Sequence, residues 1–405
     1  MKYNPSGIEF KVELESLMRG QYVFDLSSLY AHFEVLTDQR KARGIRYQLA
    51  DGLTLITLAK LGGEDGPTGM AEWLELGTEI LVAALGLERE TMPDRVTISR
   101  LLGQAVAVEE FEQVLQGYFD GQAQLSQAVV IAIDGKTLRG TIATGQSRGT
   151  HLLAAYLPEE GLVLLEVEVE TKEDEIVAAP KLLRQLDLRG KVVTGDAMQT
   201  QRQLSIEIVT AGGDYLWIAK DNQPELHQSI AHLFEPEPVT PGFAPTPTDF
   251  QTAVTFNKGH GRLERRCLTS SAMLKDYLDW PYLEQVFKLE RCFTPLQTGV
   301  VTTEIQYGLT SLTPTEAGPD RLLVLQRTHW GIENGLHYRR DVTLKEDRCR
   351  LKIGHAARTM ATLNNLVLAL ILRQGYDYLP QARRRYAARP LEALQLIMQN
   401  PYHGL

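Results

Sequence analysis

Three acidic residues lie far apart in the 405-residue sequence, each in a setting that could hold a metal ion. Asp134 ends the apolar run AVVIAID, Asp196 ends the run KVVTGD, and Glu333 lies in the polar stretch RTHWGIENGLHYRRDVTLKED. Carboxylates that converge repel one another unless a divalent cation lies between them, so their meeting would predict Mg²⁺ or Mn²⁺. Two such ions about 4 Å apart can activate a water and stabilise the leaving oxygen in phosphodiester cleavage.

Each acid alone also has a plainer interpretation. An Asp after a strand often only begins a turn, because Asp is among the commonest turn residues. His329, Glu333 and His337 are spaced four apart and would share one helix face, which is ordinarily a solvated polar stripe. Zinc is a further alternative, but the two histidines are too far apart for the H-E-x-x-H pattern. Asp341, which could share that face, is the competing choice for the third acid.

The elements that must position these acids begin after an N-terminal arm, residues 1–24, which shows no periodicity. Over residues 25–120 the apolar residues recur at helical spacing, which predicts an α-helical N-terminal domain. Near its end, Pro93-Asp94 is a helix start signal followed by two short amphipathic runs. A helix-turn-helix is an alternative there, although a plain helical bundle is favoured because short helices joined by a turn are common.

Residues 127–222 read as short strands and helices. The order is three β runs (AVVIAIDG, HLLAAYLP, GLVLLEVEVE), a helix over 174–186, the strand KVVTGD, a helix over 200–211 and the strand DYLWIAK. This order predicts an α/β sheet with three leading antiparallel strands and differs from a doubly wound dinucleotide fold. No G-x-G-x-x-G follows the first strand and no P-loop motif ends any strand, so a nucleotide cofactor has no support.

A β-rich segment over residues 223–312 is predicted to interrupt the α/β unit before its closing helices, residues 313–375. It begins with the Pro-rich EPEPVTPGFAPTPTD and continues with alternating runs such as QTAVTF and VTTEIQYGLTS. Between the runs, NKGHGRLERR places His260 between two glycines and three arginines after them. Such a loop could contact phosphate, and a solvated turn is an equally good interpretation.

Charge and cysteine content narrow the class of protein. A net charge of −9 argues against a protein that coats nucleic acid indiscriminately. The chain is acidic at the front and basic at the back, through Arg321 to Lys352 and a basic C-terminal tail over residues 376–405. This pattern permits contact with nucleic acid at one face only. Three scattered cysteines and the lack of a signal peptide or membrane span favour the cytoplasm.

Five motifs in order carry a resemblance: IAIDGKTLRG, TGDAMQTQ, AKDNQP, GHGRLERR and HWGIENGLHYRRDVTLKED. Together they resemble the DDE transposases of bacterial insertion sequences, specifically the H-repeat-associated (ISAs-type) group, over residues 128–375. The resemblance implies an RNase H-like core that requires Mg²⁺ or Mn²⁺, with two ions expected, and that cuts and joins DNA at terminal inverted repeats. It implies that Asp134, Asp196 and Glu333 are the catalytic and metal-binding triad.

The resemblance also implies double-stranded DNA partners, namely element ends and target DNA, and a homodimer or larger assembly on DNA in the bacterial cytoplasm, associated with the nucleoid when bound. The residues expected to contact DNA lie in or near these motifs: Lys136, Arg139, Lys220, His260, Arg262, Arg327, His329, Asn334, His337 and Arg340.

The glutamate motif departs from the pattern of many related transposases. Gln326, His329 and Arg340 stand where those proteins have Tyr, Arg and Lys. These departures and the acidic net charge leave open a catalytically inactive or domesticated DNA-binding descendant. A host RNase H-like nuclease, which would cut without preference for an end sequence, is a third interpretation.

Overall fold

The computed structural model describes residues 18–19, 22–23, 26–43, 45–120, 129–169, 174–236, 247–259 and 261–399. These form two compact units. The first unit takes its residues from 1–125, 139–141 and 340–405, and the second from 126–138 and 142–339. None of the helices that the structure describes has the length and apolar character needed to cross a membrane.

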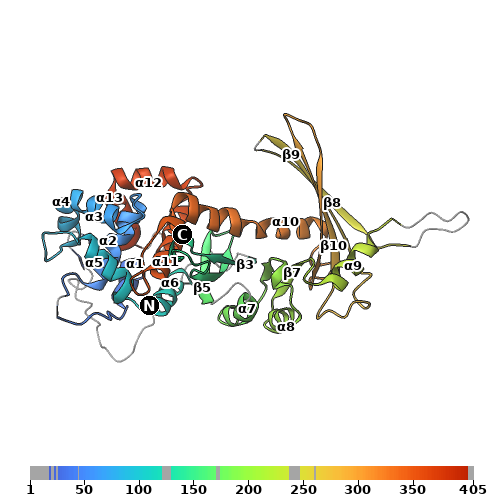
Figure 1. Cartoon of the computed structure of the whole chain (residues 1–405), viewed down its shortest axis with the longest axis horizontal. Coiled ribbons are helices and arrows are strands. Elements are labelled where there is room, and N and C mark those ends of the chain that lie inside the picture. The colour runs from blue at the N-terminus through green and yellow to red at the C-terminus, as the bar shows by residue number, and fades with distance from the viewer. Residues whose placement is uncertain are drawn as a thin grey trace, which may run out of the picture. The chain divides into compact units, whose positions relative to one another are not determined.

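The first unit is built from helices contributed by both ends of the chain (Figure 1). They are α1 (Leu29–Glu34), α2 (Leu49–Leu61), α3 (Pro67–Leu76), α4 (Thr78–Leu85), α5 (Arg95–Arg100), α6 (Val108–Asp120), α11 (Ala356–Arg373), α12 (Leu379–Ala388) and α13 (Pro390–Met398). α2 is buried along its whole length and is contacted by α1, α11, α12 and α13. The predicted start at Pro93-Asp94 is confirmed, because the Asp94 carboxylate caps α5 by accepting from Thr97 N at 2.7 Å.

The second unit is organised on one nine-stranded sheet with the order β5-β4-β3-β6-β7-β11-β10-β9-β8. The strands are β3 (Val130–Thr137), β4 (His151–Leu157), β5 (Leu162–Val169), β6 (Val192–Gly195), β7 (Asp214–Ala219), β8 (Gln251–Gly259), β9 (Arg262–Ser271), β10 (Gln285–Pro295) and β11 (Thr302–Thr310). β3, β4 and β5 are antiparallel neighbours, whereas β6 and β7 run parallel to β3. The predicted α/β sheet with three leading antiparallel strands is therefore confirmed.

Helices cover both faces of this sheet. α7 (Glu175–Leu183) and α8 (Arg202–Thr210) confirm the two helices predicted between strands, and α9 (Pro224–Leu233) and α10 (Pro319–His329) follow. Successive side chains of β7 point to opposite faces of the sheet and show which helix covers each face. Leu216 joins the apolar cluster of α10, while the next side chain, Trp217, donates from Nε1 to Ser205 Oγ of α8 at 3.0 Å.

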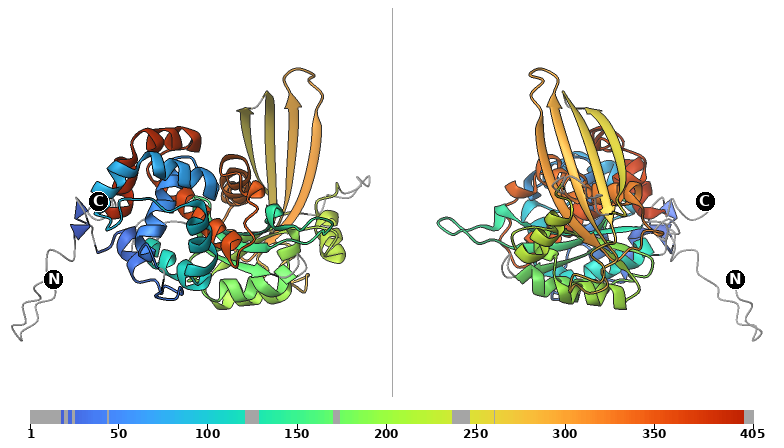
Figure 2. Two further views of the ribbon diagram at one scale, coloured as in Figure 1. Left: turned by 60° about the vertical axis from the view of Figure 1, so that its left-hand side comes forward. Right: turned by 90° about the vertical axis from the view of Figure 1, so that its right-hand side faces the viewer.

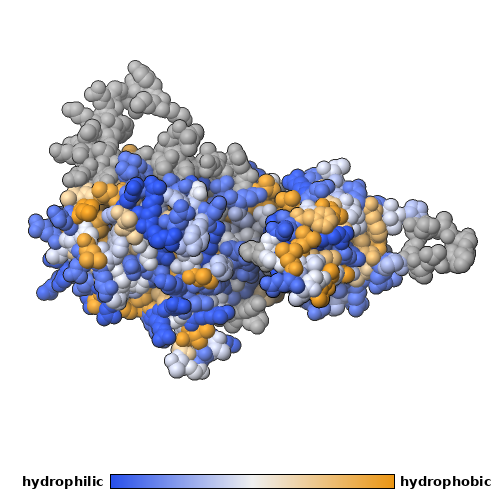
Figure 3. All heavy atoms as spheres, turned by 90° about the horizontal axis from the view of Figure 1, so that it is seen from above, coloured by the Kyte–Doolittle hydropathy of each residue, from blue (hydrophilic) through white to orange (hydrophobic). Residues whose placement is uncertain are grey.

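The β-rich segment does not form a separate sheet. β11 pairs antiparallel with β7, so β8 to β11 continue the central sheet, and their far ends project from it as two long hairpins (Figures 1 and 2). One face of this extension carries exposed apolar side chains, and hydrophobic surface lies beside hydrophilic surface over these strands (Figure 3). Those side chains are Val254, Phe256, Leu263 and Ile305.

α10 packs against the sheet through its buried leucines. Leu322, Leu323 and Leu325 belong to one apolar cluster with residues of β3, β6, β7, β9 and β10. The helix predicted to run to about Tyr338 ends instead at His329 and continues as a π-helical turn, Ile332–His337. The packing of α10 holds this turn beside β3.

Candidate metal centre

β3 and β6 bring Asp134 and Asp196 to the same edge of the sheet. The two strands are parallel, and their last paired residues are Ile133 and Gly195. Each Asp directly follows one of these residues, so both lie at the carboxyl ends of neighbouring strands, where ligands commonly bind in α/β sheets. Asp134 does not end β3 as predicted, because β3 runs on to Thr137 while paired with β4 alone.

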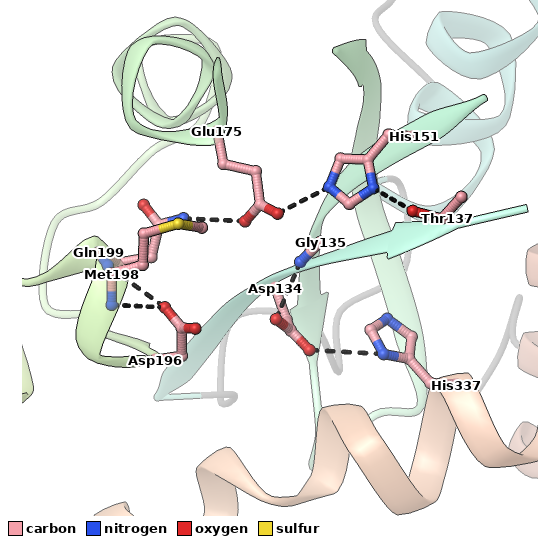
Figure 4. Close-up of polar contacts among 9 residues, drawn as sticks. All are labelled: Asp134, Gly135, Thr137, His151, Glu175, Asp196, Met198, Gln199 and His337. Carbon is pink, nitrogen blue, oxygen red and sulfur yellow. Dashed lines mark hydrogen bonds and ion pairs between the residues drawn. The ribbon is translucent and has the colours of Figure 1, made fainter. Parts of the chain in front are cut away.

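Backbone amides hold one oxygen of each Asp (Figure 4). Asp134 Oδ1 accepts from Gly135 N at 2.9 Å. Asp196 Oδ1 accepts from Met198 N at 2.9 Å and Gln199 N at 3.3 Å and thereby caps a short 3₁₀ turn. Asp196 therefore has the structural role of capping a turn through Oδ1. Its second carboxylate oxygen takes no part in the cap.

The π-helical turn brings Glu333 and His337 to Asp134. His337 Nδ1 lies 3.4 Å from Asp134 Oδ2 and 3.8 Å from Glu333 Oε2. One ligand atom from each of these three residues lies within 4.8 Å of the other two. Asp196 is close enough to act on the charge of Asp134 but is not one of these three residues. The competing acid Asp341 belongs to the first unit.

Asp134 is the poorly solvated charge of the centre, whereas the Glu333 side chain is 51% exposed. Burial, together with the negative charges of Glu333 and Asp196, raises the pKa of Asp134 to about 8. Hydrogen bonding from His337 lowers the pKa of Glu333. Burial also lowers the pKa of His329 to about 4, and its Nδ1 lies 3.1 Å from Thr194 Oγ1, so this ring is neutral at pH 7.

This set of donors fits a divalent cation. Carboxylate oxygens are the ligands that Mg²⁺ and Mn²⁺ prefer, and an imidazole nitrogen also suits Mn²⁺. His337 is buried, its Nδ1 faces the two carboxylates, and its Nε2 has no hydrogen-bond partner in the described part of the chain. Among the residues that the structure describes, the two acids are therefore the groups that engage the ring.

Comparison with known proteins decides the family. Residues 125–370 match the family model described as "Transposase DDE domain", and residues 30–119 match the DDE_Tnp_1-associated model. The chain belongs to the DDE transposase family.

Two relatives place the transposase in the expected group. It is 27% identical over 354 residues to the H repeat-associated protein YhhI of Escherichia coli (strain K12), covering 86% of this chain and 91% of that one. It is 29% identical over 357 residues to YncI of Escherichia coli O157:H7, covering 85% and 87%. The predicted resemblance to the H-repeat-associated group of insertion sequences is confirmed.

Among solved structures, a piggyBac transposase synaptic complex with hairpin DNA is similar at a TM-score of 0.38 and 10% identity, over 95% of this chain and 78% of that one.

Behind Asp134 the transposase carries a buried hydrogen-bond network that the sequence analysis missed (Figure 4). Glu175 of α7 is bound by His151 Nε2 at 2.7 Å and Gln199 Nε2 at 3.2 Å, and His151 Nδ1 lies 2.8 Å from Thr137 Oγ1. A Cβ on Gly135 would lie 2.2 Å from Glu175 Oε1, so a larger residue there would displace the Glu175 carboxylate from this network. A signal was present, since Glu175 shares a helical face with the buried Ala179 and Leu182.

The residues expected to contact DNA are not equally accessible. Five of them are exposed: Arg139, Lys220, Arg262, Arg327 and Asn334. Arg139 Nε lies 3.7 Å from Asp347 Oδ2. Lys136 and His337 are buried and His329 is largely so. His260 lies outside the described residues.

Arg340 differs most from its expected setting. Its side chain is fully buried in the first unit, where Nε lies 2.9 Å from both Glu346 oxygens and Nη1 lies 3.2 Å from Asn365 Oδ1. A guanidinium in this position is not accessible to a DNA phosphate. The expectation that Arg340 faces DNA has no support in this arrangement.

Proposed function

We propose that this chain is an active, metal-dependent DNA transposase that hydrolyses phosphodiesters and transfers strands at the ends of its insertion sequence. The observation that carries the proposal is the convergence of Asp134, Glu333 and His337 within 4.8 Å, beside Asp196, in a chain of this family. The sheet order, with three antiparallel strands followed by two strands parallel to the first, supports an RNase H-like core.

In this proposal Asp134, Asp196 and Glu333 hold divalent ions, Mg²⁺ or Mn²⁺. Two bound ions would supply a hydroxide-like nucleophile at neutral pH and neutralise charge on the leaving oxygen. Asp196 presents the oxygen that its turn amides do not use, and His337 orients the carboxylates of Asp134 and Glu333 from Nδ1. A water, and later a DNA 3′-hydroxyl, would attack the phosphorus in line. The attacking oxygen gives up its proton and forms a new P–O bond, while the opposite P–O3′ bond breaks and its oxygen leaves as a 3′-hydroxyl after taking up a proton.

The partners are double-stranded DNA of the element ends and of the target, bound by a homodimer or larger assembly in the bacterial cytoplasm. The exposed Lys220, Arg262, Arg327 and Asn334 are available for DNA contacts. The proposal keeps the domain division expected from the sequence, with a helical domain over residues 25–120, a core over 127–222 and 313–375, and an insertion over 223–312.

The test is cleavage of duplex DNA that carries the inverted repeats flanking the gene. Asp134→Ala and Glu333→Ala should each lower Mn²⁺-dependent cleavage by roughly 10³-fold or more, because each removes an oxygen ligand, while DNA binding persists. Asp341→Ala, which removes the competing acid, should still cleave. Full cleavage by the Glu333 variant, or its loss in the Asp341 variant alone, would contradict the assignment.

One observation favours a second candidate, a catalytically inactive or domesticated DNA-binding descendant. Arg340, at the position where many related transposases have a lysine, is buried against Glu346. This candidate predicts that the unaltered chain binds DNA but does not nick it with either metal, and that no inverted repeats flank the gene.

A further inference from the structure

We infer that one face of the sheet extension, together with the end of α10, binds an unpaired DNA strand next to the metal centre. We call it the arginine face and define it as Arg262, Arg266, Arg291 and Arg327 with the rings of Phe293 and Trp330. The inference rests on the proposed function and adds to it the form of DNA and the side chains that hold it.

Strand register places four of these side chains on the same face. Arg291 of β10 is paired with Arg266 of β9, and Phe293 is paired with Glu264. Since alternate residues of a strand point to the same side, Arg262, Arg266, Arg291 and Phe293 share one face. The exposed apolar residues of the extension, such as Phe256 paired with Arg265, lie on the opposite face.

α10 adds the fourth arginine. Arg327 Nη1 donates to Asn257 Oδ1 at 3.1 Å, and Arg266 Nη1 donates to the same oxygen at 2.9 Å. Asn257 lies on β8 opposite Glu264, which places it on the arginine face as well. A single amide oxygen thus ties guanidinium groups from the helix and the sheet together.

Positive charge on this face exceeds negative charge. Glu264 lies 2.8 Å from Arg266 Nη2 and 3.3 Å from Arg291 Nη2, and the half-exposed Glu304 lies 3.5 Å from Arg291 Nη1. Within the described part of the chain, Arg262 and Arg327 have no carboxylate partner. Four guanidinium groups therefore face two carboxylates, and a phosphate would relieve the repulsion among them.

The setting of Arg266 supports this charge balance. Its side chain is only 14% exposed. Burial lowers the pKa of Arg266, Glu264 opposes that shift, and the positive charges of Arg327, Arg291 and Arg262 add to it. An anion bound among these groups would be stabilised by all of them.

Two aromatic rings lie among the arginines. The guanidinium carbons of Arg262 and Arg291 are each 4.9 Å from the centre of the Phe293 ring. Arg291 is also 5.7 Å from the centre of the Trp330 ring, and Trp330 is 41% exposed. Arginines interleaved with aromatic rings are typical of surfaces that hold single strands, where phosphates bind the cations and bases stack on accessible rings, here that of Trp330.

Trp330 lies close in the chain to Glu333 and so connects the arginine face to the proposed metal centre. Trp330 caps the C-terminus of α10 and its carbonyl accepts from Asn334 N at 3.2 Å. Glu333 is three residues farther on, in the π-helical turn that also carries His337. An unpaired strand on the arginine face would therefore lie next to the turn that carries Glu333. The bases of a duplex stay paired with one another and could not stack on these rings.

The experiment measures DNA binding by the full-length chain in EDTA, so that no cleavage occurs. The probes are a fluorescein-labelled 20-nucleotide oligodeoxythymidylate and a duplex of the same length, at several salt concentrations. Arg262→Gln/Arg327→Gln should weaken binding of the single strand by about 10-fold or more and reduce its log–log salt slope by roughly 1.4, for two lost phosphate contacts. Trp330→Ala should weaken it by about 10-fold, and Trp330→Phe should restore much of the loss.

The matched control is Arg184→Gln/Arg189→Gln, which makes the same change of charge at exposed arginines outside the arginine face. This control should bind the single strand normally, and thermal unfolding should show that all variants fold. Equal binding by the control and the Arg262/Arg327 variant would overturn the inference. A loss confined to the duplex would overturn the assignment of an unpaired strand.

The two proposals can fail separately. If the unaltered chain cleaves element ends and the Arg262/Arg327 variant binds the single strand unchanged, the inference is wrong and the proposed function stands. If the unaltered chain does not cleave but this variant loses single-strand binding, the proposed activity is wrong and the arginine face stands.

Discussion

His337 is the residue whose role spacing alone did not reveal. Its four-residue spacing predicted a helical stripe shared with His329 and Glu333, and the family resemblance implied a contact with DNA. In the structure it lies 3.4 Å from Asp134, whereas His329 turns to Thr194. The difference arises because the chain leaves α-helical geometry after His329, and four-residue spacing no longer fixes a common face.

Replacing His337 should affect metal binding directly. His337→Ala should weaken Mn²⁺ binding by about 10-fold to 100-fold, because Nδ1 of the ring contacts both carboxylates. Isothermal titration calorimetry with MnCl₂ measures this without DNA or cleavage. His232→Ala removes an exposed histidine of α9 and should bind Mn²⁺ normally. Equal Mn²⁺ affinity in the two variants would exclude a role for His337 at the metal.

Lys60 is a buried cation outside the metal centre. It lies in α2 near Asp65, Glu346, Cys349 and Arg383, and its Nζ has no hydrogen-bond partner among the described residues. Burial lowers the pKa of Lys60 from 10.5 to about 8. Between pH 8 and pH 10.5, Lys60 is protonated in the unfolded chain but has lost its proton in the folded chain. The free energy of unfolding should therefore rise with pH across that range, and the cost of the buried charge should be complete below pH 8.

The variant Lys60→Met should remove this cost. At pH 7 it should raise the free energy of unfolding by up to roughly 3 kcal/mol, and the gain should shrink as pH increases toward 10.5. Urea unfolding of both proteins at pH 7, 9 and 10.5 measures the difference. A difference that does not change with pH would show that the Lys60 charge is not the cause.

At the scale of elements, α7 is tied to the metal centre by Glu175. This one carboxylate joins α7 to His151 of β4 and to Gln199 in the turn that Asp196 caps. It also fills the space left by Gly135, next to Asp134. The position of both strand-end acids thus depends on how α7 docks.

Glu175→Ala should be among the costliest substitutions in the second unit. It leaves His151 and Gln199 buried without their acceptor, which should lower the free energy of unfolding by about 3 kcal/mol or more. Glu175→Gln, which keeps the shape and one acceptor, should cost less. Urea unfolding measures both, with the exposed Lys181→Ala of the same helix as control. Equal stability of Glu175→Ala and Lys181→Ala would contradict the network.

Prediction of the elements from sequence was good where the local pattern is strong and failed where contacts override it. The strand ending near Asp134 was predicted from its apolar run, but β3 continues because β4 still pairs with it. The helix carrying Glu333 was predicted to be continuous. A close approach marks the change of geometry, since a Cβ on Gly331 would lie 2.6 Å from Pro158 Cβ, a contact between residues far apart in sequence.

For the whole molecule, composition and strand order predicted the α/β class, but not how the last strands join. Alternating runs in the β-rich segment are equally compatible with a separate sheet. The pairing of β11 with β7, for example of Thr310 with Leu216, makes these strands part of the central sheet. No local sequence pattern encodes that pairing. The same limit applies to Arg340, whose partners Glu346 and Asn365 belong to a packing arrangement that spacing from Glu333 does not describe.

The late position of Glu333 in the chain has a consequence for biosynthesis. β3 and β6 can pair once residue 195 has emerged, but β11 reaches β7 across a separation of 95 residues, and Glu333 follows only after that. Such long-range pairing is slow compared with local structure formation. A nascent or truncated chain therefore holds two of the three acids without the third. The capacity to cut DNA would arise only when synthesis and folding of the second unit are nearly complete.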